Sequence, residues 1–109
     1  MPSQLPVLTD LRLDLPAPDV RRPVEVATLL ADPTRAGILA LLARGPVCVC
    51  EMAAALGERQ NNVSNHLARL RQAGLVRTVR GSTDSRRVYY ERDEAACRAA
   101  LATLGELLR

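Results

Sequence analysis

The fold is decided by the stretch RQNNVSNHLARLRQAGLVRTVR, which covers residues 59–80. On a helical wheel of about 100° per residue, Val63, Leu67 and Leu70 fall on one side. This spacing predicts a helix over residues 59–73 with one buried face. Amide, hydroxyl and guanidinium side chains occupy the other side, a face suited to contact with DNA bases and phosphates.

Two short strands are predicted after this helix, over residues 75–80 and 87–91. Both segments are rich in β-branched or aromatic residues, and the polar loop 81–85 joins them. They form a hairpin wing, and its tip carries three arginines: Arg80, Arg86 and Arg87.

Helices are also predicted before and after this unit. Apolar residues recur at helical spacing over residues 20–31, and the stripe they predict consists of Val20, Val24, Ala27, Leu30 and Ala31. Asp32 and Pro33 then start a helix over residues 33–43, because Asp caps helix N-termini and Pro suits the first helical position. A short helix over 49–56 ends at a glycine. The last helix begins near Asp93, and its apolar stripe consists of Cys97, Leu101, Leu104 and Leu108.

This order of elements predicts a mainly α fold with a small β-hairpin. It is a winged helix-turn-helix with additional N- and C-terminal helices. This DNA-binding domain covers residues 20–109, and residues 1–19 form a Pro-rich N-terminal arm.

Composition and charge favour a small helical protein that binds a polyanion. The chain has 109 residues, no Phe or Trp and only two Tyr, so its core is built from Leu, Val and Ala. All 15 cations are Arg, and residues 59–92 carry eight Arg against two acidic residues, a local net charge of +6. Three cysteines and no apolar run of about 18 residues predict a reduced, cytoplasmic protein without a membrane segment.

Two thiols stand one residue apart in Val47-Cys48-Val49-Cys50-Glu51. At a helix N-terminus the positive end of the helix dipole favours thiolate, the form that binds metal. Residues two apart on a helix lie about 200° apart, so chelation by Cys48 and Cys50 is expected to unwind the first turn. The alternative is that both are small buried residues that only pack.

The donor set decides which ion the pair would take. Sulfur ligands exclude magnesium and calcium and favour soft ions. Two thiols without a spare histidine suit As(III) or Sb(III) better than four-coordinate zinc. Cd(II) and Pb(II) are alternatives, and no organic cofactor is expected.

Four motifs in this order resemble the ArsR/SmtB family of metal-sensing repressors: Leu29 to Arg35, Val47 to Glu51, Val63 to Leu70 and Ala73 to Val76. The resemblance covers roughly residues 20–109. It implies a homodimer that binds double-stranded operator DNA near metal-resistance genes and releases it when the inducer binds. The Cys-Val-Cys motif is most similar to the arsenite-sensing branch, and also resembles the cadmium/lead branch.

The sequence departs from each branch of the family in one respect. Position 53, where the arsenite pattern often adds a third Cys, is Ala. The N-terminal arm has no Cys, although the cadmium/lead pattern recruits one there. The zinc and nickel pattern uses His and acidic residues on the last helix, but the chain's one histidine, His66, lies on helix 59–73, the recognition helix. Cys97 is interpreted as a core or dimer-interface residue, with a role as third ligand across a dimer as the alternative.

Nine residues are predicted to contact DNA, from the outward face of helix 59–73 and from the wing. They are Gln60, Asn61, Asn62, Ser64, Asn65, Arg69, Arg80, Arg86 and Arg87. His66 is expected at the edge of the core, making a structural hydrogen bond. The alternative for the helix residues is a plain solvated face.

Rival functions remain open at this point. The thiol pair could sense persulfides or oxidants without a metal. A small dithiol oxidoreductase is disfavoured, because Cys-x-Cys lacks the two-residue spacer of the usual redox motif. A protein-interaction module would leave the basic segment without a use. No catalytic constellation is present, so the chain is predicted not to be an enzyme.

Overall fold

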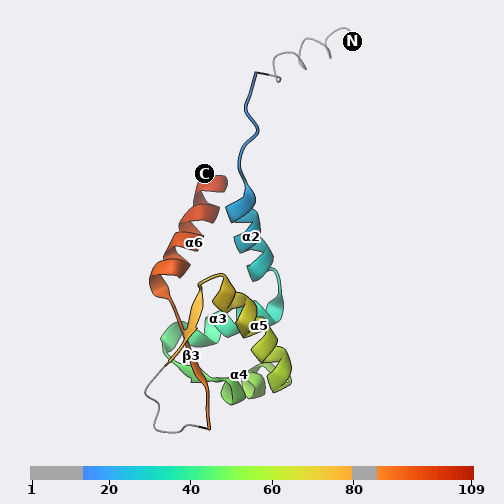
Figure 1. The fold of residues 1–109 in the computed structure, drawn as a ribbon, viewed down its shortest axis with the longest axis vertical. Coiled ribbons are helices and arrows are strands. Elements are labelled where there is room, and N and C mark those ends of the chain that lie inside the picture. Colours follow the sequence, from blue (N-terminus) through green and yellow to red (C-terminus); the bar gives the residue numbers. More distant parts are fainter. Residues whose placement is uncertain (1–13, 80–85) are drawn as a thin grey trace.

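The computed structural model describes residues 14–79 and 86–109, which form six helical elements and a small sheet (Figure 1). The elements in chain order are α2 (Arg21–Leu30), α3 (Pro33–Leu41), the 3-10 helix η1 (Leu42–Arg44), β1 (Val47–Cys48), α4 (Val49–Leu56), α5 (Gln60–Gln72), β2 (Val76–Thr78), β3 (Tyr89–Arg92) and α6 (Glu94–Leu107). The predicted winged helix-turn-helix is therefore confirmed.

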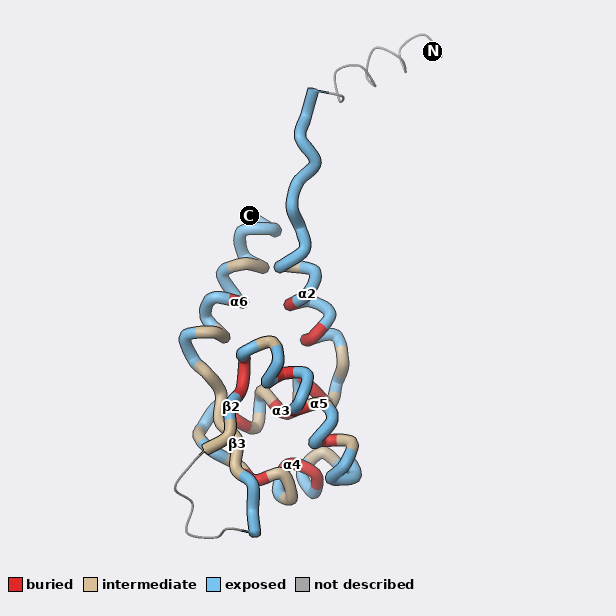
Figure 2. Tube along the Cα trace, viewed as in Figure 1, coloured by how far each residue is buried: buried red, intermediate tan, exposed pale blue. Residues whose placement is uncertain are grey.

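The helices fall into two groups. Helices α2 and α6 lie side by side, away from the rest of the body (Figures 1 and 2). Helices α3, α4 and α5 pack on one another beneath them, and the sheet covers one side of this group. The helix-turn-helix, α4 and α5, is thus joined to the α2/α6 pair through α3.

The sheet has three strands, one more than predicted. The order is β1-β3-β2, with both pairs antiparallel. Strand β1 is only two residues long, and Cys48 pairs with Tyr89. The hairpin was predicted from local pattern, whereas β1 joins it from 41 residues earlier in the chain.

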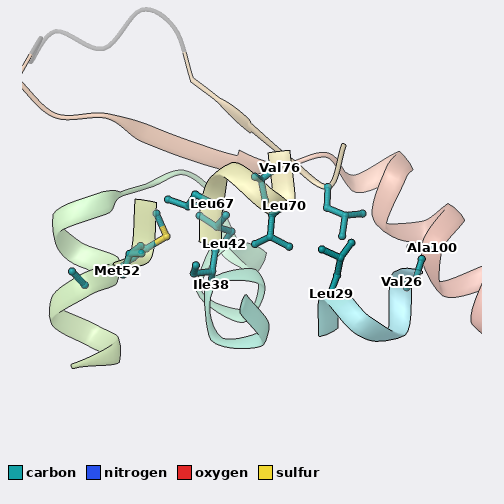
Figure 3. Close-up of a cluster of buried hydrophobic side chains, with 12 residues drawn as sticks. Val26, Leu29, Ile38, Leu42, Met52, Leu67, Leu70, Val76 and Ala100 are labelled. Carbon is teal, nitrogen blue, oxygen red and sulfur yellow. The ribbon is translucent and has the colours of Figure 1, made fainter. Parts of the chain in front are cut away.

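A continuous core connects the two groups of helices. Figure 3 shows it running from Met52 on α4, past Leu67 and Leu70 on α5, to Val26 on α2 and Ala100 on α6. All are aliphatic or small, as the composition predicted, so neighbouring helices approach closely.

Helix boundaries follow local chemistry. Asp32 accepts from the backbone N–H groups of Thr34 at 2.8 Å and Arg35 at 3.1 Å. The bond from Arg35 holds the pKa of Asp32 below its usual value. Helix α4 ends at Gly57, whose φ of 65° and ψ of 32° lie in the left-handed region that favours glycine. This residue makes the turn of the helix-turn-helix.

The buried faces of the two outer helices differ from those predicted. On α2, Val26 and Leu29 are buried, whereas Val24 of the predicted stripe is 52% exposed. On α6, Ala100 is buried and Cys97 and Leu104 of the predicted stripe pack against the core, whereas Leu101 is 70% and Leu108 83% exposed. Each helix therefore has a second apolar stripe that stays open to solvent in a single protomer (Figure 2).

Some predictions fall outside the described residues, namely Arg80, the loop 81–85 and most of the arm. Residues 16–20 are exposed and belong to no helix or strand. Among the described helices, none alone has the length and apolarity to cross a membrane. Only α2 and the segment Pro33–Arg44 meet that test together, as a pair bent by 84°.

Candidate functional site

The two thiols lie where the wing sheet meets the helix-turn-helix. Cys48 ends β1 and is also the N-cap of α4, with extended backbone at φ −83° and ψ 157°. Its Sγ accepts from the backbone N–H of Glu51 at 3.4 Å, and the Glu51 carboxylate accepts from the backbone N–H of Cys48 at 3.2 Å. This is a capping box with sulfur in place of the usual hydroxyl.

The sulfur atoms converge. Sγ of Cys48 lies 2.7 Å from Sγ of Cys50, and both are free thiols. The expectation that the thiols diverge around a helix was wrong, because Cys48 is not part of the helix. Its extended backbone turns the side chain back over the first turn of α4. An ion bound to both sulfurs therefore does not require that turn to unwind.

Geometry and burial define how an ion would fit this pair. Two thiolates that bind one tetrahedral ion at about 2.3 Å stand roughly 3.8 Å apart. Because the side chains of Cys48 and Cys50 converge, side-chain rotation alone brings their sulfurs to that spacing. Cys48 is completely buried, while Cys50 is half-buried, so an ion reaches the pair from the side of Cys50.

The charge states at the pair are set by burial and by hydrogen bonds. Burial raises the pKa of the Cys48 thiol, and the contact with Cys50 raises it further. The backbone N–H of Glu51 lowers this pKa, as expected at a helix N-terminus, but burial and the contact with Cys50 outweigh it. The hydrogen bonds between Glu51 and Cys48 hold the pKa of Glu51 below its usual value.

The wing brings cationic side chains to the same place. The backbone N–H of Val49 donates to the carbonyl of Val88 at 3.1 Å, which ties the thiol segment to the residue just before β3, at the loop end of the hairpin. A hydrogen bond with Tyr89 raises the pKa of Arg87, and the nearby thiols Cys50 and Cys48 raise it further. The Arg87 guanidinium therefore lies within electrostatic reach of the pair.

A cavity of about 180 Å³ opens beside Cys50. It is lined by Val49, Cys50, Gln60, Ser64, Arg86, Arg87 and Val88. Four of the residues predicted to contact DNA thus share one cavity with one of the residues predicted to bind metal. In the sequence these two sets lie in separate segments.

The other predicted DNA-contact residues lie elsewhere on α5. Asn61 and Asn65 are exposed on the outward face. Asn62 is half-buried, and its amide donates to the Glu58 carboxylate. Arg69 lies against α2, where it lines a separate cavity with Glu25.

Two arginines of the basic segment are held in ion pairs. Arg77 lies 2.8 Å from Glu91 and 3.2 Å from Asp93, and Arg92 lies 2.8 Å from Glu94. The net charge of +6 therefore overstates the cationic surface of residues 59–92.

His66 makes the structural hydrogen bond that was expected. Its Nδ1 accepts from Nη1 of Arg35 at 3.1 Å, because a guanidinium can only donate. Arg35 is 6% exposed and also donates to the carbonyls of Leu29 at 2.8 Å and Thr28 at 3.1 Å. This buried cation joins the end of α2 to the recognition helix.

Cys97 does not reach the thiol pair within one protomer. It is half-buried on α6, where its Sγ donates to the Leu75 carbonyl at 3.8 Å. It lines an apolar cavity of about 150 Å³ between α2 and α6. Over residues 14–79 and 86–109, no three or more His, Cys, Asp or Glu side chains form a group that could hold a metal ion.

Sequence reasoning missed Glu51, Val88 and Arg35. Glu51 had a local signal, because a cap residue followed three positions later by Glu is the capping-box pattern. Val88 and Arg35 act through long-range contacts that local patterns do not reveal.

The family model described as "Bacterial regulatory protein, arsR family" matches residues 32–78. This segment runs from the N-cap of α3 to the end of β2, and it includes the thiol pair and the recognition helix.

Known proteins of this type resemble the chain in sequence and in structure. The "Arsenical resistance operon repressor" of Escherichia coli (strain K12) is 46% identical over 55 residues, 50% of this chain and 47% of that protein. A crystal structure described as "Possible transcriptional regulator for arsenical resistance" is 32% identical, with a TM-score of 0.61 over 77% of this chain and 80% of that one.

A third similar protein is a homodimeric winged helix-turn-helix DNA-binding domain from Mycobacterium bovis, described as "a possible ArsR-family transcriptional regulator". It is 31% identical, with a TM-score of 0.60 over 78% of each chain. The chain spans about half the length of the curated relatives it matches. The matched proteins are described as regulators of transcription, which agrees with the prediction that the chain is not an enzyme.

Proposed function

Because the chain belongs to the ArsR family of bacterial regulatory proteins, we propose that it is a DNA-binding transcriptional repressor released from its operator by a thiophilic metal or metalloid. As(III) or Sb(III) is the inducer favoured, and the Cys48/Cys50 pair is its site. The observation that carries this proposal is the convergence of the two sulfurs beside the start of β3.

The DNA-binding part of the proposal rests on α5 and the wing. Helix α5 presents Gln60, Asn61, Ser64 and Asn65 on an exposed face. Its N-cap, Arg59, makes no side-chain capping bond, so no side chain at that position covers the first N–H groups of the helix. Such N–H groups bind phosphate well, and Arg86 and Arg87 add charge beside them.

The homodimer is supported by the open apolar stripes of α2 and α6. Val24, Leu101 and Leu108 are exposed, and Leu101 also lines the apolar cavity between the two helices. A similar domain is a homodimer. Covering these stripes with a second copy would remove several exposed large hydrophobic side chains from water, and would pair two recognition helices for two operator half-sites.

The choice of inducer follows from the donors. Two sulfurs and no third ligand in the described part of the protomer suit a trivalent metalloid better than zinc. Cd(II) and Pb(II) are weaker candidates. The "arsenical" descriptions of similar proteins support the same choice.

Cys48 connects the proposed ion site to the elements that contact DNA. The ion binds Sγ of Cys48, the residue that caps α4 and pairs with Tyr89 of β3. Loss of the sulfur cap or of this strand pairing would shift β3 relative to α5, and half-sites one helical turn apart do not tolerate such shifts. A change from 99% bound to 99% released needs an inducer preference of about 5.5 kcal/mol, within reach of metal-thiolate bonding.

The sulfur contact also favours a second candidate function. Two thiols 2.7 Å apart can be joined by an oxidant or a persulfide, with the thiols oxidised and the reagent reduced. The protein would then be a thiol-redox repressor of the same fold.

Gel shifts on a selected operator duplex test the proposal. Arsenite, antimonite, Cd(II), Pb(II) and Zn(II) are titrated in the presence of a phosphine reductant. Hydrogen peroxide and a persulfide donor are titrated in separate experiments without the phosphine. Release by arsenite or antimonite at the lowest concentration supports the proposal. Release from DNA only by the oxidising reagents would contradict the metal-responsive function and support the thiol-redox repressor instead. The regulator is expected to work in the cytoplasm, where thiols stay reduced.

A further inference from the structure

The bonding capacity of the thiol site is not filled by the protein. A trivalent metalloid forms three bonds, and the pair supplies two sulfurs. The chain has only one other cysteine, Cys97, which lies in the apolar cavity between α2 and α6. One bond of an ion held by Cys48 and Cys50 is therefore open to a ligand from outside this part of the protomer.

The third bond of the metalloid has space for a ligand on one side only, the side of Cys50. Cys48 is fully buried, whereas Cys50 lines the 180 Å³ cavity. That volume exceeds the ~150 Å³ of an engineered protein cavity that holds benzene. A molecule of about six heavy atoms therefore fits beside Cys50.

The walls of this cavity select for negative charge. Arg86 and Arg87 come from the segment just before β3, and Gln60 and Ser64 from the first turns of α5. Guanidinium groups form strong, directional bonds to carboxylates, and amide and hydroxyl groups complete such a site. Apart from Cys50, no side chain that lines the cavity can carry a negative charge.

We propose that the Cys48/Cys50 site takes its metalloid together with a small anionic thiol, whose sulfur fills the third bond and whose carboxylate binds in the cavity lined by Arg86 and Arg87. Arsenous acid, As(OH)₃, loses its three hydroxyls as three waters, with the protons supplied by two protein thiols and one small thiol. Three As–S bonds replace three As–O bonds, and no electrons are transferred. This inference rests on the proposed function and names the form of its inducer.

The ternary complex also explains release without a large motion. The small thiol would occupy the side chains that the proposed function assigns to DNA, namely Gln60, Ser64, Arg86 and Arg87. Its carboxylate competes with phosphate for the same guanidinium groups. The inducer thereby acts on the DNA contacts directly, in addition to binding Cys48, the residue that caps α4.

The test uses the full chain, reduced with a phosphine and mixed with one equivalent of arsenite. Three small thiols of similar size are titrated separately: thioglycolate, which is anionic, 2-mercaptoethanol, which is neutral, and cysteamine, which is cationic. Native mass spectrometry gives the composition of the adduct. The amount of arsenic retained after gel filtration, measured against the concentration of the small thiol, gives its affinity.

We expect an adduct with one arsenic and one small thiol per protomer. Thioglycolate should half-saturate it at about tenfold lower concentration than 2-mercaptoethanol, and cysteamine should need the highest concentration. Arg87→Gln should bring the three thiols within about threefold of one another, and Arg87→Lys should restore much of the order. Arg71→Gln, an exposed residue away from the cavity, serves as the matched control and should keep the wild-type order.

Two results would overturn the inference in distinguishable ways. Arsenic retained without a small thiol, or equally with all three, would remove the ternary complex and leave the proposed function intact. If such retention were lost in Cys97→Ala, the third ligand would be that thiol from a partner. Arsenic not retained under any condition would remove both the inference and the proposed inducer.

Discussion

Nη1 of Arg35 lies 3.1 Å from Nδ1 of His66, so a cation from α3 holds a side chain of the recognition helix. The same guanidinium donates to two carbonyls at the end of α2. Because α2 also carries an open apolar stripe, this contact is a physical connection between the proposed dimer interface and the proposed DNA-reading helix.

Removing this cation should destabilise the fold. Arg35→Ala leaves the Thr28 and Leu29 carbonyls and His66 without their donor in a buried place, so we expect a loss of about 2–4 kcal/mol in the free energy of unfolding. Urea denaturation followed by circular dichroism measures it. Arg44→Ala, which removes an exposed arginine, is the control and should cost less than about 0.5 kcal/mol. Equal stability of the two variants would show that the Arg35 contacts contribute nothing.

The sulfur of Cys48 should have a structural role that serine can replace and alanine cannot. Ser is a good N-cap, so Cys48→Ser keeps an acceptor for the Glu51 N–H, whereas Cys48→Ala should lose about 1 kcal/mol more. Thermal and urea unfolding of the two variants give this difference. Cys50→Ser, outside the cap, should stay close to wild type. A Cys48→Ala protein as stable as Cys48→Ser would contradict the capping role.

The two neighbouring asparagines of α5 should differ in their effect on DNA binding. Asn65 is exposed, so Asn65→Ala should weaken operator binding by about 1–3 kcal/mol. Asn62 is bonded to Glu58, so Asn62→Ala should weaken it by less than about 1 kcal/mol. Fluorescence anisotropy with a labelled duplex at fixed salt measures both. The reverse order would mean that α5 faces DNA differently from the orientation proposed.

The pH dependence of the binding affinity should differ between Cd(II) and arsenite. Burial raises the pKa of Cys48 above that of an ordinary thiol, so near neutral pH this thiol is protonated and must lose its proton when Cd(II) binds. Cd(II) affinity should therefore fall at least about tenfold for each pH unit lowered between pH 8 and 6. Arsenous acid takes up the thiol protons as water, so its affinity should be nearly constant over that range. Competition titrations measure both slopes, and a flat Cd(II) profile would contradict protonation of Cys48.

The sequence predicted most helices because their signals are local. Asp32, Gly57 and the apolar spacing over residues 59–73 place helix ends within a residue or two of those observed. The β-hairpin was likewise evident from its composition.

Two features could not be read from local pattern. The extended backbone of Cys48 depends on pairing with Tyr89, and without that strand the thiols were assigned to one helix and expected to diverge. On α2, two apolar stripes compete, and only packing against α6 decides that Val26 rather than Val24 is buried. In both cases a contact distant in sequence selects between local alternatives.

The most direct test of the account is the operator affinity of the protein with and without arsenite, measured by fluorescence anisotropy for the wild type and for Cys50→Ser. We expect arsenite to raise the wild-type Kd by at least about a hundredfold, with the variant binding DNA as tightly as the arsenite-free wild type whether or not arsenite is present. A wild-type protein that holds arsenite at Cys48 and Cys50 and still binds the operator with unchanged affinity would contradict the account.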